Sequence, residues 1–359
     1  MIRWLFKTHV YLGAALALPL MIIAATGILL GFYDELRYAE PPYRLNQAIE
    51  TSLPPAVLAQ RIQADYPDYR LEVLYLPTAP ERAIRAKLVG PDQRLAFIHP
   101  GTGQTLAMRD AAEQDGLDFL YALHRGKPLG LPGQIIASAA GVSVPLLWGV
   151  GLLLRQRRLN YRVGERNSLT IQGLHRWLGL ILGGLLAVLA VMGSLLNFAG
   201  PLKQWLDPPP RLAGSEPAMT TNIAHHLSSA ASVYPAAHLE RIYFPADKGA
   251  PLQLRFRDGG WAYLDADGRV LKIATPFSHW THLLYPLHSG RVWGTHGPKV
   301  TALFGLILFG LSGSGLYLYC RRRKAIRKRQ SLPAHTNSTT AKHLTQQGQF
   351  GAGRFDDNS

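Results

Sequence analysis

The chain has 359 residues, of which 47% are hydrophobic, yet its mean hydropathy is only +0.02, so very apolar and very polar segments must coexist. Its single cysteine, Cys320, excludes an intramolecular disulfide, a cysteine-rich zinc site and an iron–sulfur cluster held by cysteines of this chain alone. The formal net charge of +15 is concentrated next to the apolar stretches. There it serves membrane topology, and we expect no nucleic-acid partner.

Four apolar stretches are long enough to cross a bilayer as helices, which takes about 20 residues each. The first is longer than the apolar region of a signal peptide and lacks a small-residue cleavage site, so we expect it to be retained. The expected segments, in chain order, are a transmembrane helix in 1–33, a soluble module in 41–123, transmembrane helix 2 in 134–154, a basic link in 155–174, transmembrane helix 3 in 175–198, a second module in 208–287, transmembrane helix 4 in 298–320, and a basic end with a disordered tail in 321–359.

Each soluble module is predicted to pack one helix on a small antiparallel sheet, which is an α+β unit. In the first module, a helix over 53–66 precedes strand-like runs at 70–76, 82–89, 94–99 and 104–108. In the second module, a helix over 220–233 precedes strand-like runs at 238–244, 252–257, 261–264 and 269–273, and another helix covers 277–287.

The two halves of the chain are repeats of one another. The residues after His9 match those after His175 at an offset of 166, and the residues around His124 match those around His288 at an offset of 164. We call His9 and His175 the first pair, and His124 and His288 the second pair. Identical residues at these offsets include Leu12/Leu178, Gly13/Gly179, Gly27/Gly193, Leu120/Leu284, Tyr121/Tyr285, Gly126/Gly290 and Gly133/Gly297.

Basic residues crowd the link after the second apolar stretch and the segment after the fourth. Short basic loops stay in the cytoplasm. Both termini and the link are therefore expected inside, and both modules outside.

The sequence resembles the PepSY-associated transmembrane family over residues 1–329. The resemblance is carried by Leu174-His175-Arg176-Trp177-Leu178-Gly179, by its counterpart at His9, and by Leu-Tyr-x-Leu-His-x-Gly at 120–126 and 284–290. It implies a membrane α-helical fold, with four transmembrane helices in two helix–module–helix repeats and two periplasmic α+β PepSY-like modules.

The family includes ferric-siderophore reductases of the ferrioxamine type in the bacterial inner membrane, which hold b-type haems between four helices. The resemblance therefore implies a multi-pass protein of that membrane with both termini in the cytoplasm. It also implies electron transfer outward to a ferric siderophore in the periplasm, with iron released as Fe(II) for uptake.

The paired histidines suit haem, because haem iron takes axial ligands from both sides and imidazole is a common one. A pseudo-two-fold axis along the membrane normal would bring each pair together, the first near the cytoplasmic face and the second near the periplasmic face. We expect two haems b, one on each pair. A single boundary histidine is more often an interfacial polar residue or a helix cap, but both pairs are preserved through the duplication.

Glycines one helical turn after the first pair, Gly13 and Gly179, are expected to leave room for the macrocycle. Gly27 and Gly31 are expected to serve helix packing instead.

Basic residues next to the histidines are candidate partners for the haem propionates, although lipid headgroups would suit them equally well. They are Lys127 and Arg291, which are equivalent in the repeat, and Arg176. His296 is an alternative to His288 as a ligand of the second haem.

His279 and His282 are three residues apart, but two ligands alone make a poor metal site, so we expect them on a solvated helix face. No catalytic residue is identified by a motif of its own.

No glycine-rich nucleotide-binding motif is present, and the link is too short for a flavin or nicotinamide domain. The electron donor is therefore expected to be a separate molecule, a membrane quinol or a reduced flavin. The leading hypothesis is a ferric-siderophore reductase. The alternatives are a membrane-anchored PepSY binding or regulatory protein without redox activity, and a transporter, which the lack of acidic residues at mid-membrane disfavours.

Overall fold

The computed structural model describes residues 2–77, 79–159, 170–212, 223–233, 239–247 and 249–331. Among these residues, four helices are long and apolar enough to cross a membrane, with mean hydropathy between 1.7 and 2.4. They are α1 (Ile2–Leu30), α5 (Gly130–Leu159), α6 (Ile171–Leu196) and α10 (Gly297–Ser331). Each covers most of one predicted stretch, but the first and third end at Leu30 and Leu196, before the predicted ends at 33 and 198. The predicted disordered tail from 332 onward and the middle of the basic link, 160–169, lie outside the described residues.

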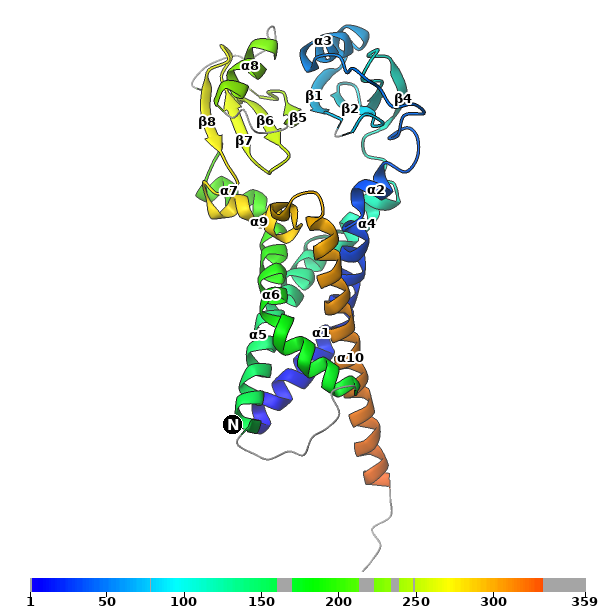
Figure 1. The fold of residues 1–359 in the computed structure, drawn as a ribbon, viewed down its shortest axis with the longest axis vertical. Helices are drawn as coiled ribbons and strands as arrows, with labels where there is room; N and C mark the ends of the chain where they lie inside the picture. Colours follow the sequence, from blue (N-terminus) through cyan, green and yellow to red (C-terminus); the bar gives the residue numbers. More distant parts are fainter. Residues whose placement is uncertain are drawn as a thin grey trace, which may run out of the picture. The chain divides into compact units, whose positions relative to one another are not determined.

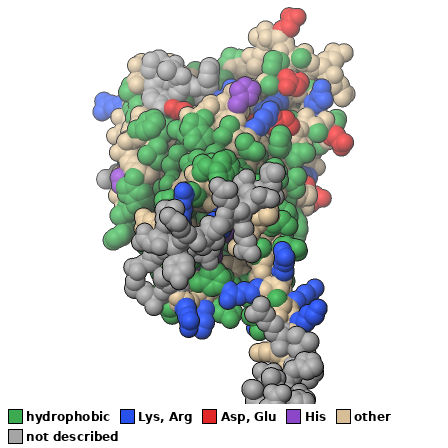
Figure 2. All heavy atoms as spheres, turned by 60° about the horizontal axis from the view of Figure 1, so that its bottom comes forward, with side chains coloured by type: hydrophobic (Ala, Val, Ile, Leu, Met, Phe, Trp, Pro, Cys, Tyr) green, Lys and Arg blue, Asp and Glu red, His purple; other side chains and the backbone are tan. Residues whose placement is uncertain are grey.

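The long helices approach one another through small residues. α5 packs against α6, where a Cβ on Gly141 would collide with the Ser194 side chain. At the equivalent contact of α1 with α10, a Cβ on Gly31 would come 2.6 Å from the Cβ of Ala302. Gly31 thus serves helix packing, as predicted. Figure 2 shows that the visible flank of the helices is largely apolar, with basic side chains at its edge.

Short helices flank the long ones and repeat in the two halves. They are α2 (Tyr33–Arg37) with α7 (Ala199–Leu206), α4 (Gly116–His124) with α9 (Trp280–His288), and the 3₁₀ turns η1 (Lys127–Leu129) with η2 (Arg291–Trp293). The region predicted as a helix over 277–287 is α9. The sequence analysis did not anticipate α2, α7 or the two 3₁₀ turns.

The turn after each second-pair histidine depends on glycine. Gly126 and Gly290 have φ of 74° and 77°, a left-handed conformation that other residues rarely adopt. A Cβ on either glycine would also collide with the carbonyl of Gly133 or Gly297, respectively. Two backbone segments therefore touch at this point, and the chain reverses sharply between α4 and α5 and again between α9 and α10.

The strands form one antiparallel sheet of eight, in the order β4-β3-β2-β1-β5-β6-β7-β8. The first module supplies β1 (Arg70–Tyr75), β2 (Ile84–Val89), β3 (Gln93–Ile98) and β4 (Thr105–Asp110), and the second supplies β5 (Leu239–Tyr243), β6 (Leu252–Phe256), β7 (Trp261–Leu264) and β8 (Val270–Ala274). Each strand begins and ends within one residue of its predicted end points, except that β2 begins two residues later than its run and β4 extends two residues beyond its run.

The two modules share this sheet, because β1 pairs with β5 through Val73↔Tyr243 and Leu74↔Ile242. The prediction of a separate sheet in each module is therefore incomplete, because the edge strands of the two modules pair.

Two helices cover one face of the sheet, α3 (Pro55–Asp65) from the first module and α8 (Ile223–Val233) from the second, and they lie next to each other. Residues 220–222 of the predicted second helix lie outside the described residues. Leu58 and Ile62 of α3 and Ile223 of α8 pack with Leu74 and Ile242 from the two central strands, and each is at most 2% exposed. A single apolar core thus lies under both helices.

Candidate functional site

The first pair brings together two long helices from opposite halves. The imidazole centres of His9 on α1 and His175 on α6 lie 6.4 Å apart, with an angle of 84° between the ring planes. Nδ1 of His9 lies 3.1 Å from the carbonyl oxygen of Leu147 on α5. His175 hydrogen-bonds the backbone of Leu311, which is equivalent to Leu147 in the repeat, and its Nδ1 lies 2.9 Å from Oγ of Ser314.

The second pair has the same design. The imidazole centres of His124 on α4 and His288 on α9 lie 6.0 Å apart, with 40° between the ring planes. Nδ1 of His124 lies 3.0 Å from the carbonyl oxygen of Ile23, and Nδ1 of His288 lies 2.8 Å from that of Leu189. Ile23 and Leu189 are also equivalent in the repeat. The chain thus orients all four rings by symmetric contacts to neighbouring helices.

These hydrogen bonds determine which ring nitrogen is available. A carbonyl oxygen only accepts, so Nδ1 must donate, and in a neutral imidazole the lone pair then lies on Nε2. Histidines that bind metals typically use this arrangement, in which the other ring nitrogen donates to a carbonyl or carboxylate. The second pair has a further partner, because Oγ1 of Thr26 lies 3.1 Å from Nδ1 of His124.

The separations fit two imidazoles on opposite sides of one metal ion. A metal–nitrogen bond of about 2 Å, plus about 1 Å from that nitrogen to the ring centre, places two such ring centres about 6 Å apart. The described residues contain no group of three or more histidine, cysteine, aspartate or glutamate side chains able to hold a metal. Among the described residues each pair thus offers two ligands, which by themselves are an incomplete set for a metal ion.

Glycines make room for the histidine rings. A Cβ on Gly193 would come 2.5 Å from Cε1 of His288, and one on Gly27 would come 3.1 Å from Cε1 of His124. Gly27 thus allows α1 to pack closely against α4, with the imidazole of His124 as its neighbour. In the first pair the ring of His175 lies over Gly315, and the ring of His9 lies over Gly151.

Gly13 and Gly179, which we expected beside the macrocycle, lie near leucines. A Cβ on either one would be 3.8 Å from a Cδ2 atom, of Leu147 or Leu311, which is an ordinary contact. Neither glycine faces a histidine ring among the described residues.

The three basic residues predicted as partners of the haem propionates differ from one another in exposure and in contacts. Lys127 and Arg176 are exposed, and neither forms an ion pair with the described residues. Arg291 lies 3.6 Å from the Glu240 carboxylate and over the ring of Tyr285. His296 is exposed at the start of α10, whereas His288 faces His124, so the geometry favours His288 as the partner of His124.

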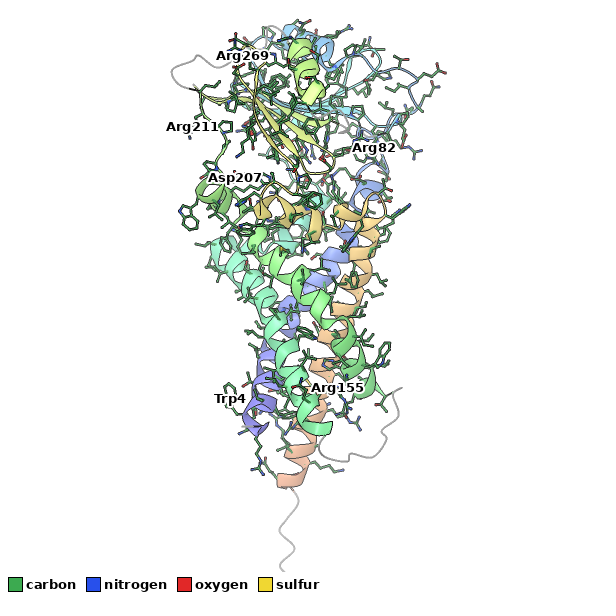
Figure 3. All side chains as sticks on the ribbon, turned by 60° about the vertical axis from the view of Figure 1, so that its left-hand side comes forward. Trp4, Arg82, Arg155, Asp207, Arg211 and Arg269 are labelled. Carbon is green, nitrogen blue, oxygen red and sulfur yellow. The ribbon has the colours of Figure 1, made fainter. Side chains whose placement is uncertain are left out.

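His282 is not on a solvated face, contrary to our expectation. It is 5% exposed, and its Nε2 lies 2.6 Å from Oδ2 of Asp207. The other oxygen of this carboxylate, Oδ1, accepts a hydrogen bond from Nζ of Lys272 at 2.6 Å. Asp207 is labelled in Figure 3 near α7. Burial lowers the pKa of His282, although the Asp207 carboxylate opposes this. His279 caps α9 by accepting from the backbone N–H of Thr281.

The first half has an ion pair at the equivalent position. Arg37 is 3% exposed and donates to the carboxylates of Asp115 and Asp118, which occupy the positions of His279 and His282 in the repeat. Asp115 and Asp118 also form a capping box at the start of α4, the helix that ends at His124. The Asp-x-x-Asp spacing was a signal for this cap that the sequence analysis did not use.

The fold and the site together define a helical membrane protein built from two repeats, each with an α+β module. The family model of the PepSY-associated TM region matches residues 6–169 and 172–343, once for each half. The chain belongs to this family and is a multi-pass membrane protein. No curated protein matches the chain significantly.

Proposed function

We propose that the protein is a di-haem b oxidoreductase of the bacterial inner membrane that passes electrons across the membrane to a periplasmic ferric siderophore and releases the iron as Fe(II). The observation that carries the proposal is the two histidine pairs, each with ring centres about 6 Å apart and with Nδ1 of both rings engaged.

The residues that would hold the two haems are His9 with His175, and His124 with His288. Haem supplies a one-electron site when bound. The chain's own contribution is orientation, because the Nδ1 bonds fix each ring and raise the basicity of Nε2. The glycines under the rings allow the imidazoles of the second pair to lie close to α1 and α6.

The two pairs lie toward opposite ends of the membrane part. His9 is in the second turn of α1, whereas His124 bonds to Ile23, which is 14 residues further along that helix. At 1.5 Å per residue this is about 20 Å along α1. Two one-electron sites at these heights would connect the two faces of the bilayer.

The charge distribution supports the direction of transfer. Arg155 lies near the end of α5 in Figure 3, and the exposed basic residues 321–324 lie toward the end of α10. By the positive-inside rule these ends are cytoplasmic, and the modules are then periplasmic. The first pair would receive electrons from a quinol or a reduced flavin, and the second pair would deliver them to the ferric siderophore.

An absorption spectrum tests the proposal directly. The full chain is purified in detergent, and spectra are recorded before and after dithionite. We expect a b-type signature with two haems per chain by the pyridine haemochrome method. His124→Ala should reduce this to about one haem, whereas His296→Ala, at an exposed imidazole outside the pairs, should retain two.

A second measurement tests the acceptor. The reduced protein is mixed separately with a ferric hydroxamate and a ferric carboxylate siderophore, haem re-oxidation is followed by stopped flow, and Fe(II) is trapped with ferrozine. A folded but colourless protein would overturn the redox proposal and favour a membrane-anchored binding or regulatory protein. A haem-loaded protein that reduces no ferric chelate would overturn the choice of acceptor.

A further inference from the structure

The face of the sheet opposite α3 and α8 carries a row of cations and aromatic rings. Residues directly opposite one another on adjacent strands share a face. Five such residues follow one another across β2, β1, β5, β6 and β7, and we call them the arginine row. They are Arg85, Tyr75, Arg241, Arg255 and Trp261.

The guanidinium groups of the row lie over its rings. The Cζ atoms of Arg85 and Arg241 are 4.6 and 5.1 Å from the centre of the Tyr75 ring, and that of Arg255 is 4.7 Å from the Trp261 ring. Arg255 also lies 5.7 Å from the ring of Tyr285 on α9. The row thus faces the helix that carries His288.

Positive charge in this region greatly exceeds negative charge. Glu240 is the acidic partner of the row: its carboxylate is 3.0 Å from Nη2 of Arg241 and 3.6 Å from Nη1 of Arg291. Arg85 and Arg255 form no hydrogen bond or ion pair with the described residues. Glu240 thus pairs with two of the four guanidinium groups in this region, and the other two have no ion-pair partner among the described residues.

The close approach of these guanidinium groups has an electrostatic cost. Arg241 and Arg255 are direct cross-strand neighbours, and like charges in that position repel. Nε of Arg241 is buried without a hydrogen-bond partner. Buried donors are normally satisfied, so a free N–H donor beside several guanidinium groups is suited to accept an anion as its partner.

We propose that the arginine row and Arg291 bind a small anion that carries several carboxylate groups. A guanidinium group presents two parallel N–H donors that match the two oxygens of a carboxylate. Adjacent strands are about 4.8 Å apart, so Arg241 and Arg255 are separated by one such step and Arg85 and Arg241 by two. A ligand that engages two or more of these groups must bridge at least one strand step of about 5 Å, which fits a polycarboxylate or its iron chelate better than a single carboxylate.

The location relates this site to the second pair. Tyr285, which contacts the row, lies one helical turn before His288 on α9. If the proposed function holds, the ligand is the electron acceptor, and the acceptor class becomes anionic, carboxylate-bearing ferric chelates. Anion binding itself does not depend on that function.

Titration calorimetry on the oxidised full chain in detergent measures anion binding independently of electron transfer. The probes are citrate, ferric citrate and an uncharged ferric trihydroxamate. We expect citrate and ferric citrate to bind, with affinity that falls as NaCl is added, and the uncharged complex to bind at least about tenfold more weakly. Arg255→Gln should weaken citrate binding about tenfold or more, because a charge-assisted hydrogen-bond pair is lost.

The matched control is Arg269→Gln, a charge removal at the β7–β8 turn, which is labelled in Figure 3 and should leave binding unchanged. Without citrate, Arg255→Gln should raise the thermal midpoint, because repulsion from Arg241 is relieved. A lowered midpoint would contradict a site that is strained until it is filled.

Three results would overturn the proposal. The first is the lack of saturable citrate binding, and the second is equal citrate binding by the Arg255 and Arg269 variants. The third is loss of haem in Arg255→Gln with unchanged citrate affinity, because this result would assign the arginine to a haem propionate. Nanodiscs of two compositions test whether the anion is a lipid headgroup. If the protein binds citrate in phosphatidylcholine discs but not in phosphatidylglycerol discs, a lipid phosphate is the ligand and the small-molecule proposal fails. Citrate binding to a colourless protein would retain the anion site and overturn its role in electron transfer.

Discussion

Gly193 of α6 supports the imidazole of His288: a Cβ added to this glycine would come 2.5 Å from Cε1 and 2.9 Å from Nδ1 of the ring. The same contact exists in the first half between Gly27 and His124, at 3.1 Å. The glycines of the repeat are thus conserved between the halves together with the histidines that they accommodate.

Gly193→Ala should therefore displace His288 and break its Nδ1 bond to Leu189. We expect the variant to lose about one of the two haems, as removal of a haem ligand would. Gly27→Ala, with a looser contact, should retain more haem than Gly193→Ala. Gly200→Ala is the control, since nothing lies within 4 Å of a Cβ at that position. Full haem content in Gly193→Ala would contradict the role of His288 as a ligand.

Arg37 should be far more important for stability than its charge alone suggests. Its guanidinium is almost fully buried between Asp115 and Asp118, and removing one partner of a buried ion pair typically costs about 3–5 kcal/mol. Arg37→Ala should lower the free energy of unfolding by about that amount, measured by denaturant titration in detergent. Arg94→Ala, which breaks a solvent-exposed pair with Asp92, should change the free energy of unfolding far less. Equal costs would contradict this assignment.

The contact of Asp207 with His282 predicts a loss of stability in acid. Burial lowers the pKa of His282 from 6.5, so below pH 6.5 the unfolded chain binds more protons than the folded one, and stability falls as the pH falls. Burial alone would raise the pKa of Asp207, but hydrogen bonds from His282 and Lys272 outweigh it and lower the pKa, which adds a further loss below pH 3.8. Thermal midpoints at pH 7.5 and 5.5 check the first effect. His282→Gln should reduce the difference between them, and a variant with the wild-type difference would refute the assignment.

The junction of the two modules can be tested by cross-linking. Val73 and Tyr243 are direct neighbours across β1 and β5, and side chains so placed have Cβ atoms about 4.5–5.5 Å apart, close to disulfide range. In a Cys320→Ser background, Val73→Cys with Tyr243→Cys should form an intramolecular disulfide that mass spectrometry detects. Val73→Cys with Lys272→Cys, four strands apart in the sheet, should not. No cross-link in the first variant would show that the modules do not share a sheet.

Much of the local structure follows from the sequence. Alternation of buried and exposed residues in short runs such as 252–256 is a strong strand signal, and β6 covers those residues. The junction of β1 with β5 was not predictable in the same way, because strand edges from distant segments pair according to shape and exposure rather than to any local pattern.

The candidate site also combines features that the sequence predicts with features that it does not predict. The repeat offsets identify all four histidines and their pairing, because a duplication preserves spacing. They do not reveal that Gly27 and Gly193 lie under the second pair, since a glycine in an apolar helix has the same sequence signature whether it faces a helix or a ring. The burial of His282 was missed because its partner, Asp207, lies 75 residues away in the chain.

By itself, the sequence determined the number of membrane helices, the repeat, the family and the identity of the paired histidines, because hydrophobic length and internal spacing are properties of the chain alone. Only the tertiary structure decided which ring nitrogens are free, which glycines accommodate the rings, and how arginines from three strands line up on one face of the sheet. These depend on contacts between segments that are far apart in the chain, and hydrogen-bond direction and close approach exist only after those segments have packed.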